Sequence, residues 1–175
     1  LSNVRNIRQN FAVARWAVQK HIDFVTAHEF MPCTGDEELD KRLSDFVAMA
    51  SEKDNFDVSG RHDRRRWMRI AEGCRLIDGD VFGLRVRGGY LQAIESDRVK
   101  NPDLMSDLVS DENPIANSPW TNGIKNDDTN RPISYAVWSR TEASQQMEYD
   151  RSIKASAVIP FGFYDRFDQI RGISP

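Results

Sequence analysis

Apolar residues recur every three or four positions between Val4 and Ala27, and no proline or glycine interrupts this span. Such spacing places the apolar side chains on one face of an amphipathic helix. We therefore expect one long helix here, with Asn3 as its N-cap. Its expected apolar stripe comprises Ile7, Phe11, Ala14, Val18, Ile22 and Val25.

Two more helices are expected from the same spacing. One begins at Asp36, after a turn marked by Pro32 and Gly35. Its expected buried face comprises Leu39, Leu43, Phe46, Val47 and Ala50. The other runs from about Asp63 to Leu76 and follows a linker over 54–60. Its expected core side carries Trp67, Ile70, Ala71 and Cys74.

The pattern changes from helices to strands at the Asp78-Gly79-Asp80 turn. Gly88-Gly89 is expected to close a two-residue hairpin between the first two strands. Trp138 ends a later strand and is expected in the core. The expected strands cover 81–87, 90–95, 133–138 and 157–159 with 161–164.

Helices followed by strands predict an α+β fold, in which amino-terminal helices precede a mainly antiparallel sheet. The length of 175 residues fits a single domain or fragment over 1–175. Within it, 1–76 is the helical part and 77–175 is the β-rich part, with a long acidic loop near 101–130. The chain starts without Met and stops at Pro175, so we expect a piece of a longer chain.

Overall composition excludes several classes of protein. The chain has 24 basic and 27 acidic residues, a net charge of −3, and no apolar run long enough to cross a membrane. Cys33 and Cys74 are isolated, and the three histidines do not cluster with them at metal-ligand spacing. We therefore expect no metal site and no membrane association.

Charge is nevertheless segregated along the chain. The segment 61–75 contains six arginines and two acids, Asp63 and Glu72, a net charge of +4. The segment 103–128 contains six acids and one lysine, a net charge of −5. Either these are two solvated faces or they form a contact between subunits. For the contact, Trp120 is the expected exposed anchor. The charged residues of the hypothetical interface are Arg64, Arg65, Arg66, Arg69, Asp103, Asp107 and Asp111.

Catalytic motifs are weak in this sequence. Asp78 and Asp80, beside Glu72 and Glu95, could form a paired-carboxylate site, but Asp-Gly-Asp before a strand is also typical of a tight turn. No Gly-x-Ser-x-Gly, GxGxxG or P-loop motif occurs. We therefore expect no catalytic or cofactor-binding residues and a protein that is not an enzyme.

Three segments carry a resemblance to a known family. The first is 69–99, with Asp78-Gly79-Asp80-Val81-Phe82 and then Leu91-Gln92-Ala93-Ile94-Glu95. The second joins Asn122-Gly123-Ile124 to Arg131-Pro132-Ile133-Ser134-Tyr135, and the third is 169–175. In this order they resemble the lambda family of tailed-phage portal proteins. The matching motif residues include Asp78, Gly79, Asp80, Gly123, Arg131, Pro132, Gln169, Arg171 and Gly172.

The resemblance implies a structural role. Portal proteins form a dodecameric ring at one capsid vertex, act in head assembly, dock the terminase, pass double-stranded DNA without reading its sequence and hold the head–tail connector. This chain would be an amino-terminal, wing-like part, located in the virion and, during assembly, in the host cytoplasm. The alternatives are a small DNA-binding or nucleic-acid-processing domain that uses the Arg61–Arg75 helix, and a cellular domain that shares only the α+β pattern.

Overall fold

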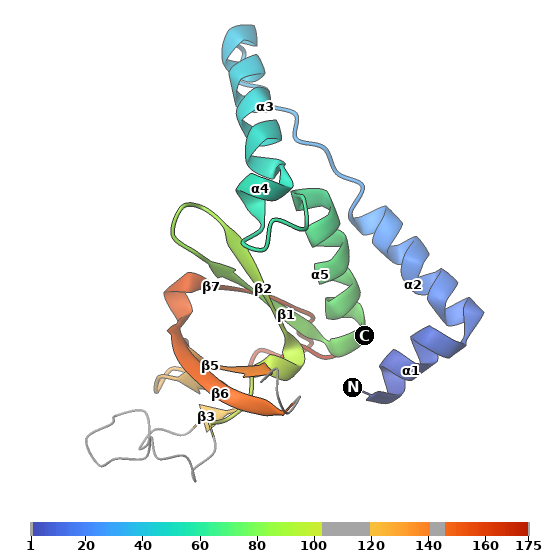
Figure 1. Ribbon diagram of the computed structural model, residues 1–175, viewed down its shortest axis with the longest axis vertical. Helices are drawn as coiled ribbons and strands as arrows, with labels where there is room; N and C mark the ends of the chain where they lie inside the picture. Colours follow the sequence, from blue (N-terminus) through green and yellow to red (C-terminus); the bar gives the residue numbers. More distant parts are fainter. Residues whose placement is uncertain (1, 103–119, 141–145, 175) are drawn as a thin grey trace.

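The computed structural model describes residues 2–102, 120–140 and 146–174, and for 2–4 only the backbone (Figure 1). In this part of the chain, helices come first and antiparallel strands follow, so the expected α+β fold is confirmed. The α-helices described are α1 (Ser2–Asn10), α2 (Ala12–Val25), α3 (Glu37–Ser51), α4 (Lys53–Phe56) and α5 (Arg64–Asp78).

The expected single helix over 4–27 is wrong, because the chain breaks between α1 and α2. Phe11 has extended backbone angles, φ −111° and ψ 113°. Figure 1 shows α1 and α2 as an open V whose two ends approach α5. A straight helix of this length would span about 35 Å, whereas the 15 residues of α5 span about 22 Å. Because the chain breaks at Phe11, both α1 and α2 can contact the shorter α5. These contacts outweigh the continuous helical spacing of apolar residues over 4–27.

Helix α3 begins where the sequence predicts, but its expected buried face is wrong. The Asp36 carboxylate accepts hydrogen bonds from the backbone N–H groups of Glu38 and Leu39, as an N-cap does. No residue of α3 is buried, and Phe46 remains 60% exposed. In Figure 1, α3 projects from the body of the molecule and meets it through α4.

Helix α5 is confirmed and lies at the centre of the helical half. The Asp63 carboxylate caps its start, and Gly79, at φ 92°, ends it. Trp67 and Ala71 are buried, as expected, whereas Ile70 is 44% exposed. The Trp67 ring packs edge-on against the rings of two phenylalanines, Phe56 and Phe161.

The strands form two antiparallel sheets where one was expected. The three-stranded sheet has the order β2-β1-β7 and contains β1 (Asp80–Arg85), β2 (Leu91–Glu95) and β7 (Val158–Gly162). The four-stranded sheet has the order β3-β4-β5-β6 and contains β3 (Trp120–Thr121), β4 (Ile124–Asn126), β5 (Pro132–Arg140) and β6 (Met147–Lys154). Two 3₁₀ segments, η1 (Ser96–Arg98) and η2 (Ala155–Ala157), connect strands.

Most expected strands are confirmed, with one correction in the first hairpin. The Val86 N–H donates to the Tyr90 carbonyl, so the turn contains three residues, 87–89, and not two. Gly88 and Gly89 both have positive φ there. Strands β3, β4 and β6 were not expected from the sequence. β3 and β4 lie within 101–130, where a long acidic loop was expected. In β6 the buried side chain is Ile153, and most of the others are polar.

Side chains along β1 point alternately toward α5 and toward the four-stranded sheet, so the three-stranded sheet is the middle of three layers. Val81 packs against Trp67 of α5, whereas Phe82 and Leu84 contribute to a core shared by the two sheets. At Gly83, a Cβ would lie 3.3 Å from Leu91 Cδ2 and from Phe161 Cε2 and 3.4 Å from the Trp67 ring, so glycine leaves room for these three side chains. The buried core between the sheets comprises Phe82, Leu84, Ile94, Val99, Ile124, Tyr135, Val137, Ile153 and Val158.

Candidate functional site

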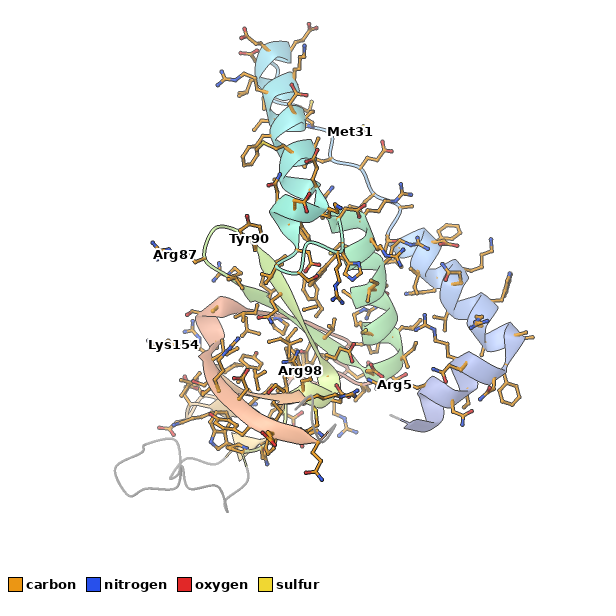
Figure 2. All side chains as sticks on the ribbon, viewed as in Figure 1. Arg5, Met31, Arg87, Tyr90, Arg98 and Lys154 are labelled. Atoms are coloured by element: carbon orange, nitrogen blue, oxygen red, sulfur yellow. The ribbon has the colours of Figure 1, made fainter. Side chains whose placement is uncertain are left out.

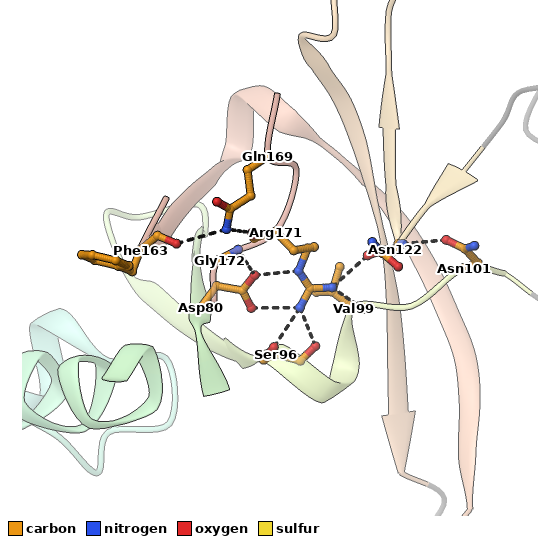
Figure 3. Close-up of polar contacts among 10 residues, drawn as sticks. Asp80, Ser96, Val99, Asn101, Asn122, Phe163, Gln169, Arg171 and Gly172 are labelled. Carbon is orange, nitrogen blue, oxygen red and sulfur yellow. Dashed lines mark hydrogen bonds and ion pairs between the residues drawn. The ribbon is translucent and has the colours of Figure 1, made fainter. Parts of the chain in front are cut away.

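A buried ion pair joins the end of the chain to the first strand. Asp80 is 1% exposed, and its two carboxylate oxygens accept hydrogen bonds from Arg171 Nε and Nη2 at 2.6 and 2.8 Å (Figure 3). The backbone N–H of Gly172 donates to the same carboxylate at 2.9 Å. This two-pronged geometry is the strong form of an arginine–carboxylate contact.

The same guanidinium also binds three other stretches of backbone. Arg171 Nη1 donates to the carbonyls of Val99 and Asn122, each at 2.8 Å. Arg171 Nη2 donates to the carbonyl and hydroxyl oxygens of Ser96, at 2.9 and 2.8 Å. Figure 3 shows these contacts around one side chain. We call the set of Asp80, Ser96, Arg171 and Gly172 the arginine junction.

Glycines allow the backbones to meet at this junction. A Cβ on Gly79 would lie 2.5 Å from the Gly172 carbonyl oxygen, and a Cβ on Gly123 would lie 2.6 Å from the Lys100 nitrogen. Gln169 helps to hold the segment 169–172, because its side-chain amide nitrogen donates to the backbone carbonyls of Phe163 and Arg171. The chain can approach this closely only where side chains are absent.

The junction gathers motif residues from all three of the sequence segments singled out above. Six of them lie in it or support it: Gly79, Asp80, Gly123, Gln169, Arg171 and Gly172. Asp78 lies next to it but pairs with Arg5. Arg131 and Pro132 lie elsewhere, at an exposed turn where the Arg131 N–H donates to Asp127. The polar atoms of Arg171 and Asp80 form hydrogen bonds within the protein itself, so this arrangement is suited to holding segments together.

The paired-carboxylate hypothesis is not supported, because three of its four acids bind cations of the same chain. Asp78 accepts two hydrogen bonds from Arg5, at 2.8 and 2.7 Å, and these raise the pKa of Arg5. Asp80 pairs with Arg171. The fourth acid, Glu95, is exposed on β2. The described residues contain no group of three or more His, Cys, Asp or Glu side chains that could hold a metal ion.

Glu72 is the third paired acid and connects α5 to α2. It accepts hydrogen bonds from Arg75 Nε and Nη2 at 2.8 and 2.7 Å, and His21 Nε2 lies 2.7 Å from Oε1. The hydrogen bonds from Arg75 lower the pKa of Glu72. Burial opposes this effect, and His21 adds to it.

We expect the lowered pKa of Glu72 to make the protein less stable in acid. A carboxylate with a lowered folded-state pKa stabilises the fold above its ordinary pKa of 4.5, and this contribution is lost as the pH falls through the folded-state value. Glu72→Gln should therefore reduce the difference between the urea midpoints measured at pH 7 and pH 3. Glu95→Gln, at an exposed position, is the control, and an equal change in both variants would contradict the expectation.

The two cysteines differ in environment. Cys33 is exposed, whereas Cys74 lies half-buried in α5. Burial raises the pKa of the Cys74 thiol to about 11, so that thiol stays protonated at neutral pH.

The arginines of the hypothetical interface do not share one environment. Arg65 and Arg66 are exposed at the start of α5, and Arg64 is half-buried. Arg69 is bound within the chain: it pairs with Asp23 at 2.5 Å and donates to the Thr26 hydroxyl at 3.2 Å. A groove of about 510 Å³ runs between α2 and α5, and its arginine lining consists of Arg8, Arg65, Arg66 and Arg69.

The partners expected for these arginines are only partly described. Asp103, Asp107 and Asp111 lie outside the described residues. Trp120 is half-buried in β3, where it pairs with Lys125, so it is less exposed than the sequence suggested. Trp67 and Trp138 are buried, as expected, and Trp16 is 62% exposed.

Two features of the helical half were missed in the sequence. Arg5 anchors α1 to the end of α5, and the pattern of apolar residues carries no signal for that pairing. Helix α2 has a second apolar face, which includes Val13, Trp16 and Phe24 and is exposed. A signal for this face did exist, because these residues fall outside the single stripe assigned to the helix.

Comparison with known proteins agrees with the family resemblance of the sequence. Among the helices of the described chain, none has the length and apolar character needed to cross a bilayer. No curated protein matches the chain. The family model described as phage portal protein, lambda family, matches residues 2–175. Because this match spans nearly the whole sequence, the chain belongs to the lambda family of phage portal proteins.

Proposed function

We propose that this chain is a structural subunit of the portal ring at the capsid vertex, acting in head assembly, terminase docking and the passage of DNA during packaging and ejection. Portal proteins are structural proteins of the phage particle, and their family implies oligomeric assembly. The observation that carries the proposal is the family match over residues 2–175. It is supported by the arginine junction, where the motif residues serve to join segments of the fold.

In this proposal the described helices and sheets form a wing-like amino-terminal part of the subunit. The double-stranded DNA passes without sequence-specific contacts, because each neutralised phosphate would add affinity and slow its movement. The slightly acidic net charge of −3 suits such a conduit. The protein would reside in the virion, and in the host cytoplasm during assembly.

The arginines at the start of α5 are proposed to contribute to the contact between neighbouring subunits. Arg64, Arg65 and Arg66 would face the acidic residues Asp103, Asp107 and Asp111 of the next copy. Arg69 would support them from within, because Asp23 already holds it. A ring requires two different complementary surfaces on each subunit, and opposite charges at separate places in the chain satisfy that need.

The test is the native mass of the intact protein, including whatever sequence flanks these residues in its gene, together with negative-stain images. We expect rings of about a dozen subunits around a central hole. Reversing the charges of Arg65 and Arg66 should weaken the ring and reduce its sensitivity to salt. A stable monomer at high protein and low salt would contradict the proposal, whereas an unchanged ring would remove only the arginine contact.

A DNA-binding domain is the second candidate, because Arg65 and Arg66 are exposed beside a groove. The same preparation tests it directly. Salt-dependent binding of duplex DNA that is lost on replacing both arginines would favour this candidate over the portal ring.

A further inference from the structure

Helix α3 lacks the packing that normally stabilises a helix of its length. It has 15 residues, none of them buried, and it contacts the body through α4. Isolated helices of about 12–15 residues are marginal in water, so protein helices depend on packing an apolar face. Figure 2 shows the side chains of α3 pointing outward around most of its length.

Helix α3 nevertheless has an apolar face. Leu39, Leu43, Phe46 and Ala50 repeat at the spacing of one helical face. Leu39 is 42% exposed and Phe46 is 60% exposed. We call these four residues the α3 stripe.

Helix α2 has apolar residues on two opposite faces. Its inner face, which includes Ile22, packs toward α5, and Ile22 is 4% exposed. Its outer face points away from the protein, and its three large residues are 78% (Val13), 62% (Trp16) and 86% (Phe24) exposed. We call Val13, Trp16, Ala17 and Phe24 the outer α2 stripe; Lys20 lies on the same face, between Trp16 and Phe24. Exposed aromatic and aliphatic residues that line up in this way mark a protein–protein contact.

The two stripes do not cover each other within one chain, because Leu39 and Phe46 of the first and Val13, Trp16 and Phe24 of the second are exposed in the same structure. A linker over 26–36 separates the helices, and Met31 in it is 81% exposed. The two helices are nearly equal in length, with 14 residues in α2 and 15 in α3.

The charges around the two stripes are opposite. Helix α2 carries Arg15 and Lys20 against Asp23, a net of +1 with neutral histidine. Residues 37–51 carry four acids against Lys41 and Arg42, a net of −2. Complementary charge around an apolar centre speeds association and selects orientation.

We propose that the α3 stripe of one subunit packs on the outer α2 stripe of the next subunit, head to tail around the ring. This contact is heterologous, as ring closure requires, because α3 and α2 are two different surfaces of each copy. The occupant is a second copy of this chain, since one sequence carries both stripes with matching length and opposite charge. The proposal rests on the portal function above and names the surfaces that carry it.

Two substitutions on α3 separate this contact from a general effect on the helix. Phe46→Asp places a charge in the stripe, whereas Ala48→Asp places the same charge on the opposite, exposed face. In the intact protein, Phe46→Asp should weaken ring formation at least tenfold, as judged by the concentration at which rings dissociate, and Ala48→Asp should leave it unchanged. Leu39→Asp, at the other end of the stripe, should repeat the result of Phe46→Asp. Circular dichroism of each variant confirms that the fold is retained.

Cross-linking tests the pairing of surfaces directly. In a Cys33→Ser background, Phe24→Cys combined with Phe46→Cys should give covalent multimers with a short bismaleimide. Each single variant, and Phe24→Cys combined with Ala48→Cys, should give few multimers. Intact rings in which Phe46→Asp behaves like Ala48→Asp, or in which the paired cysteines give no multimers, would overturn the contact while leaving the portal function standing. If the wild-type protein forms no ring, the portal function fails and the contact fails with it.

Discussion

Arg171→Ala is expected to lower the free energy of unfolding by about 3–5 kcal/mol, the usual cost of leaving one member of a buried ion pair alone. The Asp80 side chain is 1% exposed and the Arg171 side chain is 17% exposed, so water cannot replace the lost partner. The substitution also leaves the backbone carbonyls of Ser96, Val99 and Asn122 without their arginine donor.

Urea unfolding followed by tryptophan fluorescence measures this effect. Arg131→Ala is the matched control, because Arg131 is also a motif arginine but is exposed. We expect it to change the stability by less than about 0.5 kcal/mol. A loss below about 1 kcal/mol in Arg171→Ala would show that the junction contributes little to the fold, and the structural interpretation of these motif residues would have to be abandoned.

Gly79→Ala is expected to cost about 2–5 kcal/mol, because two penalties add at this position. Gly79 has φ 92°, a backbone conformation that costs an L-residue about 1–2 kcal/mol. Its Cβ would also lie 2.5 Å from the Gly172 carbonyl oxygen, which is backbone and must move, as in an overpacked core that loses about 1–3 kcal/mol.

Gly89→Ala separates the two penalties. Gly89 has nearly the same φ, 91°, but a Cβ there meets nothing within 4 Å. We therefore expect Gly89→Ala to show only the conformational cost, about 1–2 kcal/mol, in the same urea measurement. Equal losses in the two variants would mean that the approach of Gly79 to Gly172 imposes no steric limit.

These two predictions concern how the protein holds its own segments together. The arginine junction binds 169–172 to the end of α5 and the start of β1, so the position of this segment relative to the three-stranded sheet is fixed. Holding these segments together is a physical reason why motif residues far apart in the chain meet at one point.

Local rules in the sequence predicted several boundaries correctly. Asp36 and Asp63 cap helices, and Gly79 ends α5, because a short acid at an N-terminus and a glycine at a C-terminus act through their immediate neighbours. Trp67 and Trp138 are buried as expected, and β5 lies where a strand was predicted. The α+β order followed from the same local patterns.

Expectations that depended on distant partners were less successful. Periodicity showed that α3 has an apolar face but could not show that the fold leaves this face uncovered. It also could not show that α1 and α2 are separate helices, because the break at Phe11 follows from anchoring by Arg5 and Ile22 to different parts of α5. Strand β6 was missed because its exposed side chains are mostly polar, and pairing with β5 defines it as a strand.

The sequence by itself determined the family, the α+β class and the residues of the motifs, since each depends on residue types in order along the chain. Only the tertiary structure decided what the motif residues do. Asp80 and Arg171 are 91 positions apart, and no local pattern can indicate that one is the counter-ion of the other. Likewise, burial is a property of the assembled fold, and the exposed stripes of α2 and α3 became visible only when the rest of the chain was in place.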